Sequence, residues 1–355
     1  MDKARTEISA IGEFGLINRI REIVDFHIDD TALHENLLMG ISDDAAVYRP
    51  TPGKLQLLTT DAFAEGIHFD LTYTSLKHLG WKVLAANFSD LAAMGAIPRY
   101  ATVNLALPGK FSVEMVEEFY AGAAQACKTY ACLIVGGDTI TSPANTMISI
   151  SVAGEAEPSR IVYRNGARPG DYACVTGHLG GSLAGLKILQ REKQRFRQSG
   201  NAGKFHPNLE PYARAIEKHL MPKPRLDISK LMNEQVTVNA MIDISDGLTS
   251  EVHHLCTASG VGASIYEHNL PVEQVTQAIA GELSESPVDY ALYGGEEYEL
   301  LFAIADDEFE KLQRFTNDVT IIGRFTKKED GIILVREGGE HASLQFGGWD
   351  HFKSR

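Results

Sequence analysis

The spacing of hydrophobic residues predicts alternating helices and strands in the first half of the chain. Apolar residues that recur every three or four positions are typical of helices with one buried face, and short apolar or alternating runs are typical of strands. On this basis we predict helices at 13–26, 76–94 and 113–129. We predict strands at 55–60, 100–107, 132–135 and 147–154, with Asp61 closing the first strand and a turn at 136–138 following the third.

The same alternation continues in the second half and predicts a second α/β domain. The expected strands are 172–176, 241–244, 263–267 and 298–304, and the expected helices are 182–190 and 247–258. Glycine and proline are frequent at 154–170, which favours a junction between domains there. We therefore predict an α/β (α+β) chain with two domains, 1–155 and 156–355. The polar stretch 191–211 is expected to form an exposed insertion or loop.

Composition and charge disfavour several classes of protein. With 44% hydrophobic and 23% charged residues among 355, the chain has an ordinary globular composition. Its net charge of −14 disfavours sequence-independent binding to nucleic acid and to anionic membranes. The longest apolar run, 300–305, is far shorter than the ~18 residues that span a bilayer, and the N-terminus lacks the apolar core of a signal peptide. The four cysteines form no CxxC pair, so we expect a reducing, cytoplasmic location.

The most informative polar residues are aspartates that stand beside glycine, serine or threonine. These aspartates are Asp43, Asp61, Asp90, Asp138, Asp243 and Asp246. Most of the six follow a predicted strand or begin a predicted helix. Mg²⁺ prefers carboxylate oxygens and typically bridges them to phosphates, and nearby glycines let backbone N–H groups approach a phosphate. Taken singly, each aspartate is more readily explained as a turn former or a helix cap. So many in one chain favour a shared site for metal and phosphate.

Other common motifs for phosphate binding and nucleophilic catalysis are absent from the sequence. The nearest match to a P-loop, 180–187, has Leu186 where the lysine belongs. No GxGxxG follows a predicted strand, and no GxSxG elbow occurs.

Seven motifs, in order along the chain, together resemble the thiamine-monophosphate kinase family. They are GISDDAAV (40–47), LLTTDAFAEGIHF (57–69), LGWKVLAANFSDLAAMGAIP (79–98), IVGGDT (134–139), RNGARPGD (164–171), MIDISDGL (241–248) and YGGEEYELLF (293–302). The resemblance runs from about residue 12 to residue 352. Its most specific parts are NFSDLAAMGA and the pair DISDGL and GGEEYEL.

The resemblance implies a fold, partners and an activity. The family belongs to a superfamily of ATP-dependent enzymes with aminoimidazole ribonucleotide synthetase, selenophosphate synthetase and a hydrogenase-maturation protein. It implies an N-terminal α/β domain that binds ATP and metal and pairs through its sheet into a homodimer, followed by a C-terminal α/β domain. It further implies that ATP phosphorylates thiamine monophosphate to thiamine diphosphate with the help of several Mg²⁺ ions.

The resemblance also implies roles for individual residues. It implies metal ligation by Asp43, Thr59, Thr60, Asp61, Asp90, Asp138, Asp243 and Asp246. It implies ATP contacts at Tyr120, Gly137, Asp138, Arg164 and Ser245, and acceptor contacts at His68, Glu296 and Trp349. Two residues depart from the family's pattern: Ser42 replaces the usual glycine before the Asp pair, and Glu297 replaces the usual aspartate of GGEDYEL.

The charges of the two substrates agree with this reading. A phosphate monoester and ATP are both anions, so cations must bring them together, and carboxylates can hold Mg²⁺ where no P-loop lysine is present. We therefore expect direct in-line transfer of the γ-phosphoryl group without a covalent phosphoenzyme. No residue is singled out as a nucleophile.

Two alternative functions remain. One is another ATP-dependent enzyme of the superfamily with a different acceptor. The position of the first cysteine, Cys127, disfavours a selenophosphate synthetase, and residues 352–355 lack the terminal cysteine of the hydrogenase-maturation relatives. The other is a non-catalytic scaffold that binds divalent metal, which the presence of nearly every motif acid disfavours.

Overall fold

The computed structural model describes residues 5–27, 34–41, 43–199 and 206–349, which form two compact units. The first unit comprises Met1–Leu91 and Ala96–Ser159, and the second comprises Ala92–Gly95 and Arg160–Arg355. Ser42, one of the two departures from the family's pattern, lies outside the described residues. No helix in the described part of the chain is long and apolar enough to cross a membrane.

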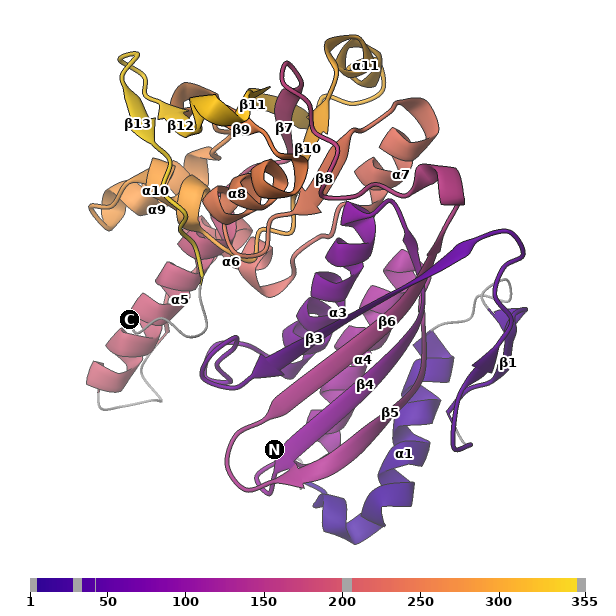
Figure 1. Ribbon diagram of the computed structural model, residues 1–355. Helices are drawn as coiled ribbons and strands as arrows, with labels where there is room; N and C mark the ends of the chain where they lie inside the picture. Colours follow the sequence, from indigo (N-terminus) through magenta and orange to yellow (C-terminus); the bar gives the residue numbers. More distant parts are fainter. Residues whose placement is uncertain (1–4, 28–33, 42, 200–205, 350–355) are drawn as a thin grey trace. The chain divides into compact units, whose positions relative to one another are not determined.

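The first unit is built on a four-stranded sheet in the order β3-β6-β4-β5 (Figure 1). Its strands are β3 (Leu55–Ala64), β4 (Ile97–Pro108), β5 (Leu133–Ser142) and β6 (Met147–Ala156). β6 runs antiparallel to β3 and β4, whereas β4 and β5 are parallel. A separate two-stranded sheet pairs β1 (Leu37–Met39) with β2 (Val47–Tyr48).

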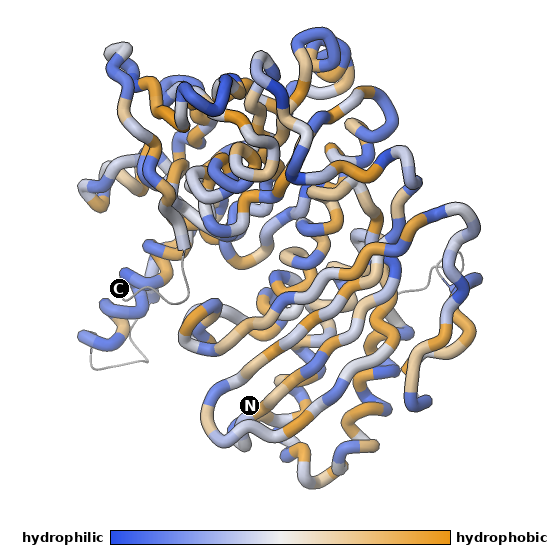
Figure 2. The backbone as a smooth tube through the Cα atoms, viewed as in Figure 1, coloured by the Kyte–Doolittle hydropathy of each residue, from blue (hydrophilic) through white to orange (hydrophobic). Residues whose placement is uncertain are grey.

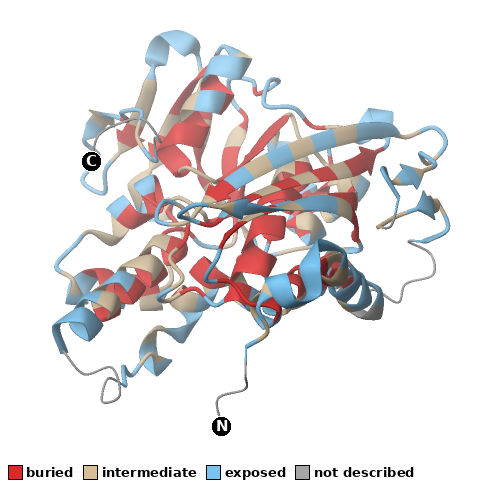
Figure 3. Cartoon of the chain, turned by 90° about the horizontal axis from the view of Figure 1, so that it is seen from below, coloured by how far each residue is buried: buried red, intermediate tan, exposed pale blue. Residues whose placement is uncertain are grey.

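Helices cover one face of this four-stranded sheet. They are α3 (Leu76–Ala93) and α4 (Val113–Tyr130), with α1 (Ile8–His27) packed on α4. The covered face follows from the alternation along the strands: Ile148 and Ile150 of β6 are buried, whereas Ser149 and Ser151 between them are partly exposed. Hydrophobic residues therefore line the side that meets the helices, and the opposite side of the strands stays open. Figure 2 shows hydrophobic and more hydrophilic residues interspersed along these strands, and Figure 3 shows buried and more exposed ones.

The predicted helices of the first unit are confirmed, but two predicted strand ends are wrong. β3 does not end at Asp61; it continues to Ala64, and Asp61 pairs with Ile150. β5 likewise continues through the expected turn at 136–138 to Ser142. Gly137 makes this possible, because its φ is +153° and a Cβ on it would lie 1.9 Å from the carbonyl oxygen of Val103 in β4.

The second unit is built on a seven-stranded sheet in the order β13-β12-β9-β11-β7-β10-β8. Its strands are β7 (Tyr172–Thr176), β8 (Ala240–Asp243), β9 (Gly262–Tyr266), β10 (Leu300–Ile304), β11 (Val319–Thr326), β12 (Ile332–Val335) and β13 (His341–Ser343). Neighbouring strands are antiparallel except β12 and β9, which are parallel.

Both faces of this seven-stranded sheet are buried. The face that carries Val175 and Ile242 packs on α8 (Leu248–Ser259). The other face, with Phe302, packs on α7 (Leu226–Gln235) and α11 (Asp306–Leu312). A further apolar cluster joins α5 (Gly181–Ser199), α6 (Ala213–Leu220), α9 (Gln274–Glu282) and α10 (Pro287–Tyr293). The short 3₁₀ helices are η1 (Pro158–Arg160), η3 (Glu210–Tyr212), η4 (Glu267–Asn269) and η5 (Lys328–Asp330).

The four strands and two helices predicted for the second half are confirmed, with small shifts at their ends except for α5, which is nine residues longer at its C-terminal end. The interpretation of 191–211 as a loop is wrong for its first part, because α5 continues to Ser199. Arg191 and Arg195 both pair with Glu192 there, and Arg191 also pairs with Glu282 of α9. Residues 200–205 of this stretch lie outside the described residues.

Candidate functional site

In the first unit, β3 and α3 bring two of the predicted metal ligands into contact. The hydroxyl of Thr59 donates a hydrogen bond to Oδ2 of Asp90. Asp61 shares the face of β3 that carries Thr59 and the buried Phe63, because alternate residues of a strand point to the same side. The helix-covered face of β3 and the facing side of α3 thus present oxygen atoms of the kind that ligate metals, from Thr59, Asp61 and Asp90.

Thr60 points to the opposite face of β3. Its hydroxyl donates to the carbonyl oxygen of Ile150 at 2.8 Å and accepts from the hydroxyl of Ser151 at 3.1 Å. The structure therefore ties Thr60 to β6 and separates its side chain from that of Asp61.

Asp138 lies on β5, at the other edge of the sheet. It is exposed and pairs with the exposed Asn104 of β4, on the face that the helices leave open. Three strand spacings, about 14 Å, separate β5 from β3. Within one chain, Asp138 therefore does not join the oxygen donors around Asp90.

Three further predicted residues of the first unit have different surroundings. Asp43 is exposed, and its Oδ1 accepts a hydrogen bond from the backbone N–H of Asp44 at 2.8 Å. His68 Nδ1 accepts from the backbone N–H of Ala64 at 3.0 Å, which fixes its ring beside the end of β3. Tyr120 is only 3% exposed inside α4, and burial raises the pKa of its hydroxyl. The predicted ATP contact at Tyr120 thus falls on an enclosed side chain.

In the second unit, the turn between β8 and α8 gathers the predicted metal and nucleotide residues. Asp243 is the last residue of β8, is buried, and pairs with Leu300 of β10. Ser245 and Asp246 follow in the turn and are partly exposed, and α8 begins at Leu248. A turn that leads into a helix N-terminus is a favourable position for a phosphate, because its N–H groups and the helix dipole face the anion.

Glu251, which the motifs did not single out, supports this turn from the first turn of α8. Its Oε1 accepts a hydrogen bond from the backbone N–H of Asp246 at 3.0 Å. Its Oε2 is buried and has no hydrogen-bond partner among the described residues. Burial, together with the charges of Asp246 and Asp243, raises the pKa of Glu251 to about 8. Its position four residues after the glycine that precedes α8 is a signal that could have identified it.

A second segment, 294–299, lies against the same turn. The backbone N–H of Glu296 donates to the carbonyl oxygen of Ser245 at 2.7 Å, and the N–H of Tyr298 donates to that of Ile244 at 2.9 Å. Glu296 and Tyr298 have positive backbone φ values of 59° and 53°, which residues other than glycine rarely adopt. Such strained positions gather at functional sites, and here they place the predicted acceptor residue Glu296 beside Ser245.

The C-terminal segment brings Trp349 to this turn as well. Its backbone N–H donates to the carbonyl oxygen of Asp246 at 3.0 Å, and the hydroxyl of Thr249 donates to the carbonyl oxygen of Gly347 at 2.8 Å. The side chain of Trp349 remains 38% exposed. Asp246, Glu296 and Trp349 are thus all attached to one turn of the second unit.

Arg164 belongs to a loop that is anchored at the other end of α8. The hydroxyl of Ser259 accepts hydrogen bonds from the backbone N–H groups of Gly166 and Ala167, each at 3.1 Å. Burial lowers the pKa of His254 on α8, the charge of Arg164 lowers it further, and the charge of Asp246 raises it. The charge of Arg164 therefore lies near α8, on the side of the helix that carries His254.

The oxygen atoms that these residues offer are chemically suited to a hard divalent cation. Within either unit, no three His, Cys, Asp or Glu side chains of the described residues lie close enough to hold a metal by themselves. The available donors are carboxylate and hydroxyl oxygens, which Mg²⁺ prefers, and Mg²⁺ usually keeps substrate phosphates and water among its ligands. The orphaned Oε2 of Glu251 adds buried polar surface beside Asp243 and Asp246 that suits a nearby cation.

Comparison with known proteins identifies both halves of the chain. Residues 42–156 match the family described as AIR synthase related protein, N-terminal domain. Residues 168–336 match the family described as AIR synthase related protein, C-terminal domain.

Individual relatives extend the match over nearly the whole chain. The thiamine-monophosphate kinase of Aquifex aeolicus is 36% identical over 97% of this chain and 99% of its own length. The crystal structure of the thiamine-monophosphate kinase from Stenotrophomonas maltophilia is 31% identical with a TM-score of 0.76, covering 94% of this chain and 98% of that one. The structure of AaThiL complexed with AMPPCP and TMP is 33% identical with a TM-score of 0.73, covering 99% of this chain and 100% of that one.

Proposed function

Because the chain belongs to the thiamine-monophosphate kinase family, we propose that it transfers the γ-phosphoryl group of ATP to thiamine monophosphate, forming thiamine diphosphate and ADP. The observation that carries the proposal is the full-length similarity, at 33% identity, to a protein that binds AMPPCP and TMP together. The folded positions of the motif residues support it, since Asp246, Glu296 and Trp349 are attached to a single turn.

The chain's contribution to the reaction is to hold charge and to orient two anions. Bound Mg²⁺ would neutralise the phosphates as they approach each other. Asp61 and Asp90 of the first unit, and Asp243 and Asp246 of the second, would hold such ions through their carboxylates. The hydrogen bond from Thr59 fixes the Asp90 carboxylate in advance, so less reorganisation is needed when charge develops.

The remaining predicted residues divide between nucleotide and acceptor. We assign ATP contacts to Gly137, Asp138, Arg164 and Ser245, and also to Tyr120, although its ring must become accessible for this role. We assign acceptor contacts to His68, Glu296 and Trp349. The thiazolium ring of thiamine is a flat cation, which a tryptophan face attracts and a carboxylate neutralises.

A homodimer is part of the proposal. The open face of the four-stranded sheet carries exposed apolar side chains, among them Leu58 (79%), Ile140 (57%) and Met147 (54%). A second copy of the same face would cover them by a symmetric contact. Asp138 lies on this face, so in the proposed dimer it would lie at the contact between the two sheets.

A cytoplasmic location completes the proposal. The four cysteines, all within the described residues, are free and buried, as expected in a reducing compartment.

An ADP-release assay tests the proposed function. Wild-type protein with ATP, Mg²⁺ and thiamine monophosphate should release ADP, and the release should stop when EDTA removes the metal. Thiamine, which lacks the acceptor phosphate, is the matched control and should give no release. ADP release that does not depend on thiamine monophosphate would favour a different acceptor, and no nucleotide turnover with any acceptor would favour the metal-binding scaffold.

A further inference from the structure

Two consecutive residues of α6 pair with two consecutive residues of segment 294–299. Nζ of Lys218 lies 2.9 Å from Oε2 of Glu297, and Nδ1 of His219 lies 3.5 Å from Oε2 of Glu296. The four residues belong to the second unit. The helix therefore provides one cationic or hydrogen-bonding partner for each carboxylate of the pair.

His219 is buried and has a second partner. Its residue exposure is 3%, and Nδ1 also lies 3.1 Å from the hydroxyl oxygen of Ser182, at the start of α5. Nδ1 therefore has two oxygen neighbours: the hydroxyl of Ser182, which can either donate or accept a hydrogen bond, and the carboxylate of Glu296, which can only accept one. The tautomer that carries its hydrogen on Nδ1 is the one that interacts favourably with Glu296, the predicted acceptor-binding residue.

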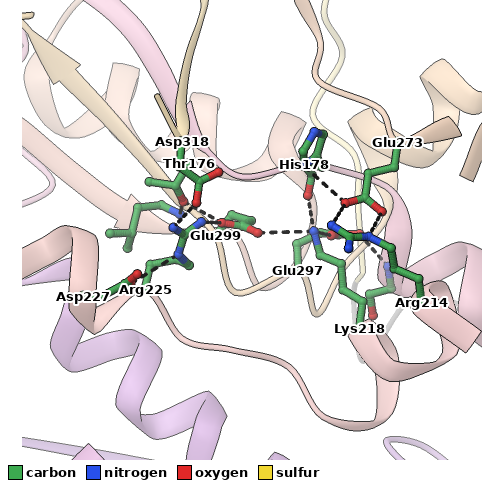
Figure 4. Close-up of polar contacts among 12 residues, drawn as sticks. Thr176, His178, Arg214, Lys218, Arg225, Asp227, Glu273, Glu297, Glu299 and Asp318 are labelled. Carbon is green, nitrogen blue, oxygen red and sulfur yellow. Dashed lines mark hydrogen bonds and ion pairs between the residues drawn. The ribbon is translucent and has the colours of Figure 1, made fainter. Parts of the chain in front are cut away.

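Lys218, which precedes His219 in α6, belongs to a network of charged side chains that includes Glu297 and Glu299 (Figure 4). Lys218 reaches Glu299 as well as Glu297, at 3.3 Å from its Oε1. Glu299 in turn accepts from Arg225 at 2.8 Å and from the hydroxyl of Thr176 at 2.7 Å. Nearby charges outweigh burial and raise the pKa of Lys218 to about 12, so the ammonium stays charged. These contacts hold α6 in a fixed position against segment 294–299.

The side chain of Glu297 is enclosed on the other side of this network. It is 2% exposed, and its Oε1 accepts from the backbone N–H of Ser182 at 3.0 Å. Ser182 therefore touches both halves of the arrangement: its N–H contacts Glu297, and its hydroxyl contacts His219. Glu297, the glutamate that departs from the family's pattern, is thus buried, whereas the side chain of the neighbouring Glu296 is partly exposed, at 26%.

We propose that His219 is a positioning residue for the phosphoryl acceptor, which acts by holding the carboxylate of Glu296 in the orientation that binds a cationic acceptor. The inference rests on the proposed function, because that function supplies the acceptor. Nδ1 of His219 lies 3.5 Å from the carboxylate of Glu296, and the burial of the imidazole ring together with its contact to Ser182 restricts where the ring can lie. With its hydrogen on Nδ1, the ring favours one orientation of that carboxylate.

A matched pair of variants at His219 tests this role. The amide nitrogen of asparagine occupies the position of Nδ1, whereas that of glutamine occupies the position of Nε2. His219→Gln should raise KM for thiamine monophosphate about tenfold, the loss expected from one hydrogen bond to a charged group. His219→Asn should keep this KM within about threefold of wild type. KM for ATP should stay within about twofold in both variants, and kcat should change less than KM for the acceptor.

A double-mutant cycle shows whether His219 acts through Glu296. In a Glu296→Gln background, adding His219→Gln should change KM for thiamine monophosphate by less than about twofold, because the carboxylate is already neutral. His341→Asn, at an exposed position of β13, is the control and should match wild type. Circular dichroism of each variant checks that the fold is kept.

Three results would overturn the inference while wild-type turnover continues. They are equal KM values for the His219→Asn and His219→Gln variants, equal shifts in KM for both substrates, and additive effects of the two substitutions in the cycle. Absence of wild-type turnover with thiamine monophosphate is a different outcome, which rejects the proposed function itself.

Discussion

The backbone N–H of Trp349 donates a hydrogen bond to the carbonyl oxygen of Asp246, with 3.0 Å between nitrogen and oxygen. Gly348 precedes this contact with φ +122°, and a Cβ there would lie 2.4 Å from the same carbonyl oxygen. Only glycine allows the chain to pass this close to the carbonyl oxygen of Asp246. The position of Trp349 therefore depends on the turn that carries Asp246, a predicted metal ligand.

Trp349→Ala should weaken binding of the acceptor and leave the nucleotide largely unaffected. A tryptophan face attracts a cation by about 0.5–2 kcal/mol, which corresponds to a rise of about 2- to 30-fold in KM for thiamine monophosphate. KM for ATP should barely change, and Trp349→Phe should recover part of the loss because it keeps an aromatic face. Steady-state kinetics with each substrate varied in turn measures this. Equal shifts in both KM values, or a lower melting temperature with unchanged kinetics, would instead indicate that the ring only caps the domain.

Asp90→Asn should abolish turnover while the protein stays folded. The substitution keeps the shape of the side chain that accepts from Thr59 and removes the charge that would hold Mg²⁺. We expect kcat at saturating Mg²⁺ to fall below a tenth of wild type, a loss of more than about 1.4 kcal/mol in the barrier. Thr59→Val, which removes the hydroxyl that donates to Asp90 but leaves the carboxylates in place, should have a smaller effect. An Asp90→Asn variant that keeps more than about a tenth of wild-type kcat would exclude a role as shared metal ligand.

The pair of Arg214 and Glu273 predicts an acid-dependent loss of stability. Arg214 donates to both carboxylate oxygens of Glu273, at 2.7 and 2.6 Å, and these hydrogen bonds lower the pKa of that carboxyl below 4.5 (Figure 4). A lowered pKa adds stability above pH 4.5 that is lost as pH falls through the folded-state pKa. Because Arg214 is largely exposed, we expect a contribution of only about 0.5–1 kcal/mol.

Urea unfolding of the wild type and Arg214→Ala at several pH values measures this contribution. The difference in free energy of unfolding should be present at pH 7 and should shrink at pH 4 and below. In a Glu273→Gln background, the Arg214→Ala difference should not depend on pH. A difference that grows as the pH falls would contradict the assignment.

The open sheet face predicts the oligomeric state. Leu58→Asp would place a charge within the proposed contact, which should convert a dimer of about twice 38.8 kDa into monomers. Phe315→Asp, at an exposed apolar residue of the second unit, is the matched control and should remain dimeric. Light scattering at micromolar concentration decides the question, and a wild-type monomer would reject the homodimer.

The sequence predicted the strands β3 to β10 and the helices α1, α3, α4, α5 and α8, because their apolar residues repeat with a clear period. It did not predict the helices α6, α7, α9, α10 and α11 or the strands β1, β2, β11, β12 and β13. It failed where a residue's role depends on a distant neighbour. The Gly-Gly-Asp run of β5 has the composition of a turn, but Gly137 is required by the close approach of Val103 in β4. The charged end of α5 has the composition of a loop, but Arg191 pairs with Glu282 of α9. Neither partner is visible in the local sequence.

The candidate site follows the same rule. The aspartates could be found because they stand beside glycine, serine and threonine in the sequence, although Asp61 and Asp138 lie inside their strands rather than at the ends. The supporting residue His219 could not be found, since its partner Glu296 lies in a distant segment and no motif joins them. Nor could the sequence indicate that Asp61 and Asp138 lie at opposite edges of one sheet, because strand order is a property of the whole fold.

The most direct test of the proposed reaction follows the phosphorus atom. Wild-type protein is incubated with Mg²⁺, thiamine monophosphate and ATP labelled in the γ-phosphate, and the products are separated by anion-exchange chromatography. Direct transfer predicts that the label appears in thiamine diphosphate in equal amount with ADP, with none bound to the protein after denaturation. Label recovered as inorganic phosphate, with thiamine monophosphate unchanged, would contradict the account.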